Sequence, residues 1–119
     1  MITQYTMTAT VAGTGATVDS DTIIGEILKV DMDVNGDSMD INLDTLGEQK
    51  SQAIIDYTGN TDSTFYPLVA SVINTGASTS LYAATFPVMV PYVVYGKLRL
   101  TLASAAAGET VTMTVTVRT

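Results

Sequence analysis

The chain has 119 residues, of which 46% are hydrophobic, and a formal net charge of −7 at pH 7. This length suits a single domain that buries roughly two thirds of its unfolded surface. The absence of Cys and His excludes disulfides, Ser-His-Asp and Cys-His nucleophile pairs, and ordinary zinc sites, and the five Lys and Arg residues disfavour nucleic acid as a partner.

No apolar run approaches the ~20 residues of a membrane helix. The first residues, MITQYTMTATV, lack the basic and apolar regions of a signal peptide. We therefore expect a protein that is made in a cytoplasm and has no membrane partner. The Gly-Thr-Gly at residues 13–15 lacks the ending and the following helix of a phosphate loop, so we expect no cofactor.

The first segment, residues 4–12, alternates apolar residues with threonines, which predicts a strand with one dry and one wet face. A loop is predicted over residues 13–21. We treat residues 1–119 as one β-sandwich domain, and we also consider that residues 1–21 are an arm that becomes ordered on assembly.

Residues 22–34 alternate again and predict a second strand, in which Ile24, Leu28, Val30, Met32 and Val34 share one face. Glu26 interrupts that face, which indicates a bulge or a change of neighbouring strand around Gly25. Asn35-Gly36 follows and predicts a type I′ hairpin turn. Centring the turn there pairs Met32 with Met39, Val30 with Ile41, and Leu28 with Leu43.

The middle of the chain predicts strands over residues 52–57 and 65–74, separated by polar loops over 44–51 and 58–64. Residues 81–95, LYAATFPVMVPYVVY, are almost wholly apolar and contain Pro87 and Pro91. Because proline cannot donate to a strand ladder, this segment is predicted to lie at an edge or in a covered loop.

The last quarter of the chain predicts a long antiparallel hairpin. Leu98, Leu100 and Leu102 alternate with polar residues, and Val111, Met113, Val115 and Val117 do the same after a small-residue loop. Pairing Leu102 with Val111 places both apolar sets on the core side. Without a helical period anywhere, about eight short strands predict an all-β, antiparallel β-sandwich that is jelly-roll-like.

Asp31, Asp33, Asn35, Gly36 and Asp37 match the first positions of a D-x-D-x-N-G calcium loop. The match fails at its last position, where Asn42 replaces the bidentate Glu. In the predicted hairpin Asp31 lies opposite Asp40, a repulsive pair that a cation would relieve. Asp31, Asp33 and Asp40 therefore remain a weak candidate cation site, and a solvated strand face is the simpler interpretation.

Two surfaces are candidate interfaces. Residues 81–95 either form an edge strand within one subunit or meet another subunit, since large apolar patches are rarely left in water. Lys97, Arg99 and Arg118 on the wet face of the closing hairpin either pair with nearby acids or form a basic strip toward a partner. The candidate interface residues are Phe86, Val88, Met89, Val90, Tyr92 and Arg99.

The order of motifs provides a resemblance that covers most of the chain. The motifs are IIGEILKVDMDV at 23–34, YPLV at 66–69, NTG at 74–76, FPV at 86–88, YGKLRLTLA at 95–103 and VTMTVTV at 111–117. The chain resembles the small β-sandwich proteins of tailed-bacteriophage virions, particularly head decoration (cement) proteins.

This resemblance implies a non-enzymatic protein on the outer surface of a capsid, made in the bacterial cytoplasm. It implies that the protein binds the major capsid protein and clamps neighbouring subunits after head expansion. Because such proteins often form trimers, it also implies a homotrimer. One alternative is a tail, neck or head-fibre component. Another is a host glycan- or receptor-binding module that uses Tyr57, Tyr66 or Tyr82, and the weakest is a carboxylate-dependent hydrolase.

Overall fold

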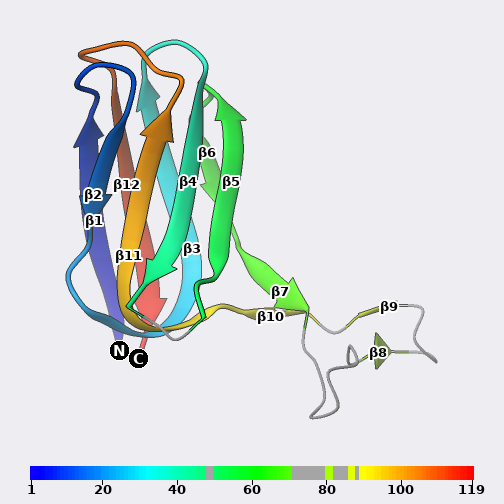
Figure 1. The fold of residues 1–119 in the computed structure, drawn as a ribbon. Helices are drawn as coiled ribbons and strands as arrows, with labels where there is room; N and C mark the ends of the chain where they lie inside the picture. The colour runs from blue at the N-terminus through cyan, green and yellow to red at the C-terminus, as the bar shows by residue number, and fades with distance from the viewer. Residues whose placement is uncertain (48–49, 71–79, 82–85, 88) are drawn as a thin grey trace.

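The computed structural model describes residues 1–47, 50–70, 80–81, 86–87 and 89–119. These residues form twelve strands and no helix (Figure 1). The strands are β1 (Ile2–Thr10), β2 (Ala16–Asp19), β3 (Ile23–Asn35), β4 (Met39–Leu46), β5 (Ala53–Gly59), β6 (Ser63–Phe65), β7 (Leu68–Ala70), β8 (Ser80–Leu81), β9 (Phe86–Pro87), β10 (Met89–Pro91), β11 (Val93–Ala103) and β12 (Thr110–Arg118). The predicted all-β, antiparallel fold is confirmed.

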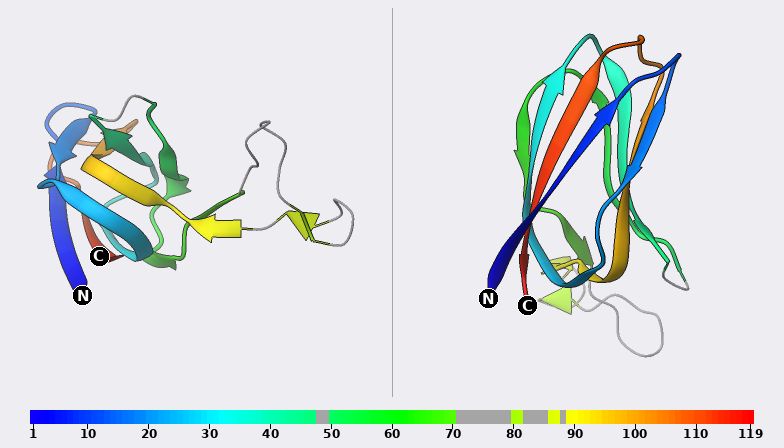
Figure 2. Two further views of the ribbon diagram at one scale, coloured as in Figure 1. Left: turned by 90° about the horizontal axis from the view of Figure 1, so that it is seen from below. Right: turned by 90° about the vertical axis from the view of Figure 1, so that its left-hand side faces the viewer.

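Eight strands make one antiparallel sheet that folds over itself into two layers (Figures 1 and 2). One layer has the order β1–β12–β3–β6, and the other has the order β2–β11–β4–β5. The layers are joined where the start of β3 pairs with the start of β11, from Ile23 opposite Gly96 to Glu26 opposite Val93. The two termini lie side by side, and the Thr119 N–H donates to the carbonyl of Met1.

The space between the layers is filled by the apolar residues that alternate along each strand. Burial of these side chains is the main favourable term in folding. The fully or nearly fully buried set is Met7, Ala9, Val11, Ile23, Ile27, Val30, Met32, Met39, Ile41, Leu43, Ile54, Ile55, Val94, Leu98, Leu100, Leu102, Val111, Met113, Val115 and Val117. Period-two alternation therefore identified most of the inward-facing residues correctly.

The predicted closing hairpin is wrong. Strands β11 and β12 lie in different layers, and the connection between them crosses the end of the sandwich (Figure 1). Leu102 lies opposite Ile41 and Ala16, whereas Val111 lies opposite Ala9 and Val34. A hairpin that paired Leu102 with Val111 would also place Lys97 opposite Thr116 and Arg99 opposite Thr114. Instead Lys97 lies opposite Leu46 and Arg99 opposite Asp44.

The predicted Asn35-Gly36 hairpin is wrong for the same reason. Met32 on β3 lies opposite Met113, and Met39 on β4 lies opposite Gly59. A type I′ turn requires positive φ at both Asn35 and Gly36. Gly36 has φ of 155°, but Asn35 does not have positive φ, because Ser104 is the one non-glycine residue of the described chain that does. The connection is an arch between layers, and both methionines point into the same core from opposite sides.

The predicted irregularity near Gly25 is confirmed. At Glu26, β3 exchanges β11 for β12 as its neighbour, and the register with β12 shifts by one residue at Leu28. This shift turns Ile23 and Ile27 inward and leaves Ile24 exposed. The expectation that Ile24 shares the buried face is therefore wrong, because a one-residue slip moves every side chain to the other face.

The amino-terminal residues belong to both layers. Strand β1 pairs with β12 along its whole length, as its alternation predicts. The predicted loop over 13–21 instead contains β2, which pairs with β11 from Ala16 to Asp19. The hypothesis that residues 1–21 become ordered only on assembly stays a prediction.

The apolar segment leaves the sandwich as a separate ribbon. Strand β7 pairs with β10, and β8 pairs with β9, in two small two-stranded sheets. Pro87 and Pro91 lie in these ribbons and not in the eight-stranded sheet, as expected from their missing N–H groups. The β7–β10 ribbon extends outward from the end of the sandwich where β11 begins (Figures 1 and 2).

Candidate functional site

The three aspartates of the candidate cation site are not brought together. Asp31 lies on β3 opposite Thr114 and Thr64, and its carboxylate accepts a hydrogen bond from the Thr64 hydroxyl at 2.7 Å. Asp40 lies on β4 in the other layer and accepts from the Thr58 hydroxyl at 2.8 Å. The predicted opposition of Asp31 and Asp40 is therefore wrong, because it depended on the Asn35-Gly36 hairpin.

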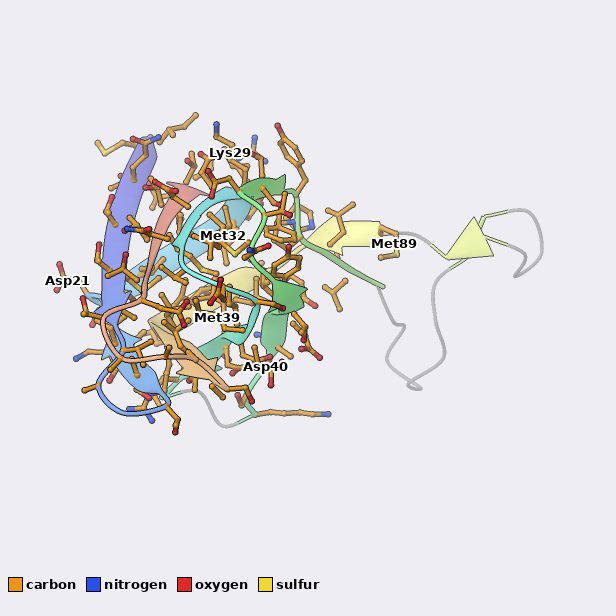
Figure 3. All side chains as sticks on the ribbon, turned by 90° about the horizontal axis from the view of Figure 1, so that it is seen from above. Asp21, Lys29, Met32, Met39, Asp40 and Met89 are labelled. Atoms are coloured by element: carbon orange, nitrogen blue, oxygen red, sulfur yellow. The ribbon has the colours of Figure 1, made fainter. Side chains whose placement is uncertain are left out.

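Figure 3 shows this separation, since Lys29 and Asp40 lie on opposite sides of the sandwich. Lys29 forms an ion pair with Asp31 at 3.4 Å. The Thr64 hydrogen bond, and then Lys29, lower the pKa of Asp31. Within the described residues, no group of three His, Cys, Asp or Glu side chains is placed to hold a metal ion.

Two of the three basic residues of the last quarter, Arg99 and Arg118, are paired with acids. The Arg99 guanidinium donates to both carboxylate oxygens of Asp19, at 2.8 and 3.1 Å. This bidentate hydrogen bond lowers the pKa of Asp19. Arg118 donates to Glu26 at 2.8 Å in the other layer. Because Arg99 and Arg118 belong to β11 and β12, they do not form the continuous strip that the hairpin register predicted.

The candidate interface residues fall into three groups. Met89 and Val90 lie on β10, and Phe86 lies on β9. Tyr92 anchors the base of the ribbon, since it is half-buried against the core and its hydroxyl donates to the Ala53 carbonyl at 3.0 Å. Arg99 lies on the sandwich, away from the ribbon. Val88 lies outside the described residues.

The register of the ribbon decides which side chains share a face. Pro91 lies opposite Leu68, and Met89 lies opposite Ala70, so Leu68, Met89 and Pro91 are on one face. Leu68 is 48% exposed and Met89 is 46% exposed. Figure 3 places Met89 on the ribbon, well apart from Met32 and Met39 in the core. One face of the ribbon is thus apolar and open to solvent.

An apolar hollow of about 240 Å³ lies beside the base of this ribbon. Its walls come from β5 and from the end of β6, which are the edge strands of the two layers. The residues that line it are Ile54, Ile55, Asp56, Phe65, Tyr66 and Pro67. Tyr66 is 69% exposed at its rim, and sequence reasoning did not identify this hollow.

Tyr57 packs against Phe65, which lines the hollow. Their rings meet edge to face with centroids 6.0 Å apart. The Tyr57 hydroxyl accepts the backbone N–H of Thr61 at 3.2 Å, which fixes the loop between β5 and β6. Tyr57 therefore stabilises this edge, and of the two proposed glycan-binding tyrosines that the structure describes, Tyr66 is exposed and Tyr57 is half-buried. Tyr82 lies outside the described residues.

The ribbon and half of the residues that line the hollow belong to one uncharged part of the sequence. No Asp, Glu, Lys or Arg occurs between Asp62 and Lys97, although the whole chain carries twelve acidic and five basic residues. In contrast, the outer faces of the sandwich carry threonines and acids, such as Thr8, whose hydroxyl lies 3.0 Å from that of Thr112. The ribbon is thus an uncharged surface on an acidic protein.

Comparisons with protein-family models, with curated proteins and with solved structures give no match to this chain. No helix in the described part of the chain is long and apolar enough to cross a membrane. The features that distinguish this surface are the exposed ribbon face and the adjoining hollow, which together suit contact with another protein chain.

Proposed function

We propose that this chain is a virion structural protein that decorates the outer surface of a tailed-phage capsid and stabilises its lattice by binding the major capsid protein. The observation that carries the proposal is the β7–β10 ribbon. It presents Leu68 and Met89 to solvent, and Val93 and Tyr95 at the start of the neighbouring β11 are exposed as well. Exposed apolar patches of this kind are typical of protein–protein contacts.

We further infer that the two layers are a jelly roll. The layer orders β1–β12–β3–β6 and β2–β11–β4–β5 support this, because they follow from two Greek-key connections in which the first and last strands become neighbours. Jelly rolls occur in viral capsid proteins and in lectins. The fold therefore favours a structural or binding role over catalysis without choosing between them.

The ribbon favours the structural role. An acidic body with paired Arg99 and Arg118 side chains offers little basic surface, whereas the uncharged ribbon can be buried between capsid subunits or between copies of this protein. A homotrimer at a three-fold position of the capsid is the assembly we propose. A tail, neck or head-fibre position would use the same surface on a different partner.

Glycan or receptor binding is the second candidate, and the exposed Tyr66 beside Asp56 favours it. An aromatic ring next to a carboxylate can bind a sugar by stacking and hydrogen bonding. Yet the hollow of about 240 Å³ is smaller than the roughly 300–1,000 Å³ of most ligand pockets. We therefore rank this candidate below capsid decoration.

Co-sedimentation with phage heads separates these candidates. The purified protein is mixed with expanded, empty heads of the encoding phage, and unexpanded proheads are the control. Saturable binding to expanded heads without signal on a glycan array supports decoration. Binding to glycans without binding to heads would contradict it, and binding to purified tails alone would favour the tail position.

A further inference from the structure

We propose that the hollow between β5 and β6 receives an arginine side chain from a partner protein, with its guanidinium beside Asp56 and its aliphatic stem against the apolar walls. The inference deepens the proposed function. On a phage head the partner that donates the arginine is the major capsid protein, and this identification rests on the proposed function. Recognition of the arginine itself does not.

A β-bulge in β5 forms part of the hollow. The register of β5 with β4 shifts between Leu43 and Asp44, so Ile54 is an extra residue with no residue opposite it. Such bulges are common at sheet edges and change the direction of a side chain. Here Ile54 and Ile55 are consecutive, yet both are buried and both line the hollow. Because β5 is the edge strand of its layer, no further strand of the described chain covers this space (Figure 1).

The walls of the hollow suit the stem of a long basic side chain. Apart from Asp56, the residues that line it are apolar or aromatic. Its volume of about 240 Å³ lies below the roughly 300–1,000 Å³ of most small-molecule sites. Arginine packs its methylene groups against apolar surface while its charged end stays near water. Tyr66 is 69% exposed at the rim, and guanidinium groups stack well on such rings.

Charge selects a cation as the occupant. Asp56 is the one charged residue that lines the hollow, and it belongs to none of the ion pairs of the described chain. Asp56 lies opposite Asn42 on β4, and Asp44 lies two residues further along that strand. Partial burial, and then Asp56, raise the pKa of Asp44, so the two carboxylates repel one another. A cation in the hollow relieves this repulsion, and the net charge of −7 attracts it.

The hollow favours arginine over other side chains. A guanidinium can donate two parallel hydrogen bonds to one carboxylate, as Arg99 does to Asp19 on this same protein. A lysine ammonium is a compact, strongly hydrated charge that lacks this planar fork and stacks less well on an aromatic ring. A neutral apolar side chain would fill the hollow but gain nothing from Asp56.

Peptide titration tests this assignment on the purified protein. The probe is a blocked Gly-Arg-Gly peptide, and its control contains citrulline, which has the shape of arginine without the charge. Backbone amide shifts of the isotope-labelled protein are followed by NMR. We expect the arginine peptide to shift the amides of Ile55, Asp56 and Tyr66 in a saturable way. The citrulline peptide should bind about tenfold more weakly, because it cannot form the charged pair, and Gly-Lys-Gly should also bind more weakly.

Matched variants identify the groups that bind the peptide. Asp56→Asn should weaken binding of the arginine peptide by about tenfold. Tyr66→Ala should weaken it by about threefold, whereas Tyr66→Phe keeps the ring and should bind as the wild type does. Asp33→Asn removes an exposed acid of the other layer and should leave the affinity almost unchanged.

Several results would overturn the proposal: no binding, equal affinity for the citrulline or lysine peptide, an equal loss for Asp33→Asn, or saturation without shifts at the hollow. A neutral methyl glycoside that shifts the same amides as strongly would assign the hollow to sugars and overturn it as well.

Co-sedimentation with expanded heads separates this inference from the proposed function. Head binding that Asp56→Asn weakens and Asp33→Asn does not would support both. Arginine binding by a protein that does not bind heads would contradict only the decoration function. Head binding that Asp56→Asn leaves unchanged would contradict only the arginine contact.

Discussion

The carboxylate of Glu109, in the connection between β11 and β12, accepts a hydrogen bond from the backbone N–H of Asp37, in the connection between β3 and β4. The other oxygen of Glu109 accepts the backbone N–H of Ala106. One side chain therefore ties the β3–β4 connection to the β11–β12 connection.

This arrangement predicts a stability that depends on pH. The hydrogen bond from Ala106, and then that from Asp37, lower the pKa of Glu109 below its usual value of 4.5. An acid with a lowered folded pKa stabilises the protein above its unfolded pKa and loses that contribution as pH falls through the folded pKa. We expect Glu109→Gln to be less stable than wild type at pH 7, because an amide has only one acceptor oxygen.

Thermal denaturation of both proteins between pH 7 and pH 3 measures this effect. The difference in Tm should be full at pH 7 and should shrink below about pH 4.5. Asp33→Asn, an exposed change on β3, serves as the control for a lost charge. A Tm difference that stays constant with pH would show that Glu109 does not act through its charged form.

Asp44 has the opposite electrostatic environment. Partial burial, and then the nearby Asp56, raise its pKa. Because the pKa of Asp44 is higher in the folded state than in the unfolded state, the free energy of unfolding falls as pH rises from about 3.8 through the pKa of the folded state. We expect Asp44→Asn to stabilise the protein at pH 7 by a few tenths of a kcal/mol, since the group is largely solvent-screened. Urea denaturation at pH 7 and pH 4 measures it, and a gain that is larger at pH 4 would contradict this interpretation.

The ion pair between Arg99 and Asp19 joins β11 to the edge strand β2. We expect Arg99→Asp to lower the Tm, because it places two carboxylates opposite one another. The exchange of both residues, Asp19→Arg with Arg99→Asp, should restore part of that loss, because a carboxylate at position 99 still lies opposite Asp44 on β4. The restoration should weaken in 1 M salt. If the double exchange is no more stable than the single variant, the pair contributes nothing specific.

The arches also explain how far sequence could predict this fold. Alternation places Met32 and Met39 on buried faces, and both are buried. It does not distinguish a neighbour in the same sheet from a strand that faces it across the core, because both arrangements bury the same side chains. The Asn-Gly sequence suggested that β3 and β4 are neighbours in one sheet, whereas in the structure they face each other across the core.

Sequence predicted part of the candidate site, the apolar ribbon, but not the hollow beside it. The prolines of residues 81–95 indicated an edge or covered segment, and Met89 does lie outside the sandwich. The hollow could not be found in the same way, since Ile54 and Phe65 belong to edge strands of different layers. Their proximity follows only from the layer order, which the wrong hairpins concealed. The only local sequence feature that pointed to the hollow was the Phe-Tyr-Pro sequence at residues 65–67, which supplies three of the residues that line it.

Gly25 lies where β3 changes partner and the two layers join. Its φ is +150°, and a Cβ there would lie 2.5 Å from the Arg118 carbonyl oxygen and 2.8 Å from the Val117 side chain. A backbone atom cannot give way as a flexible side chain can. Gly25→Ala should therefore force β3 and β12 apart and reduce the free energy of unfolding by on the order of 3 kcal/mol.

Gly13→Ala is the matched control, because Gly13 also has positive φ, at +79°, but nothing lies within 4 Å of an added Cβ. It should cost only the strain of the left-handed backbone, about 1–2 kcal/mol. Urea denaturation of both variants gives the comparison. Equal losses would mean that the contact with β12 adds nothing, and that the layers are held together elsewhere. A larger loss for Gly25→Ala would locate the joint between the layers at this crossing of β3, β11 and β12.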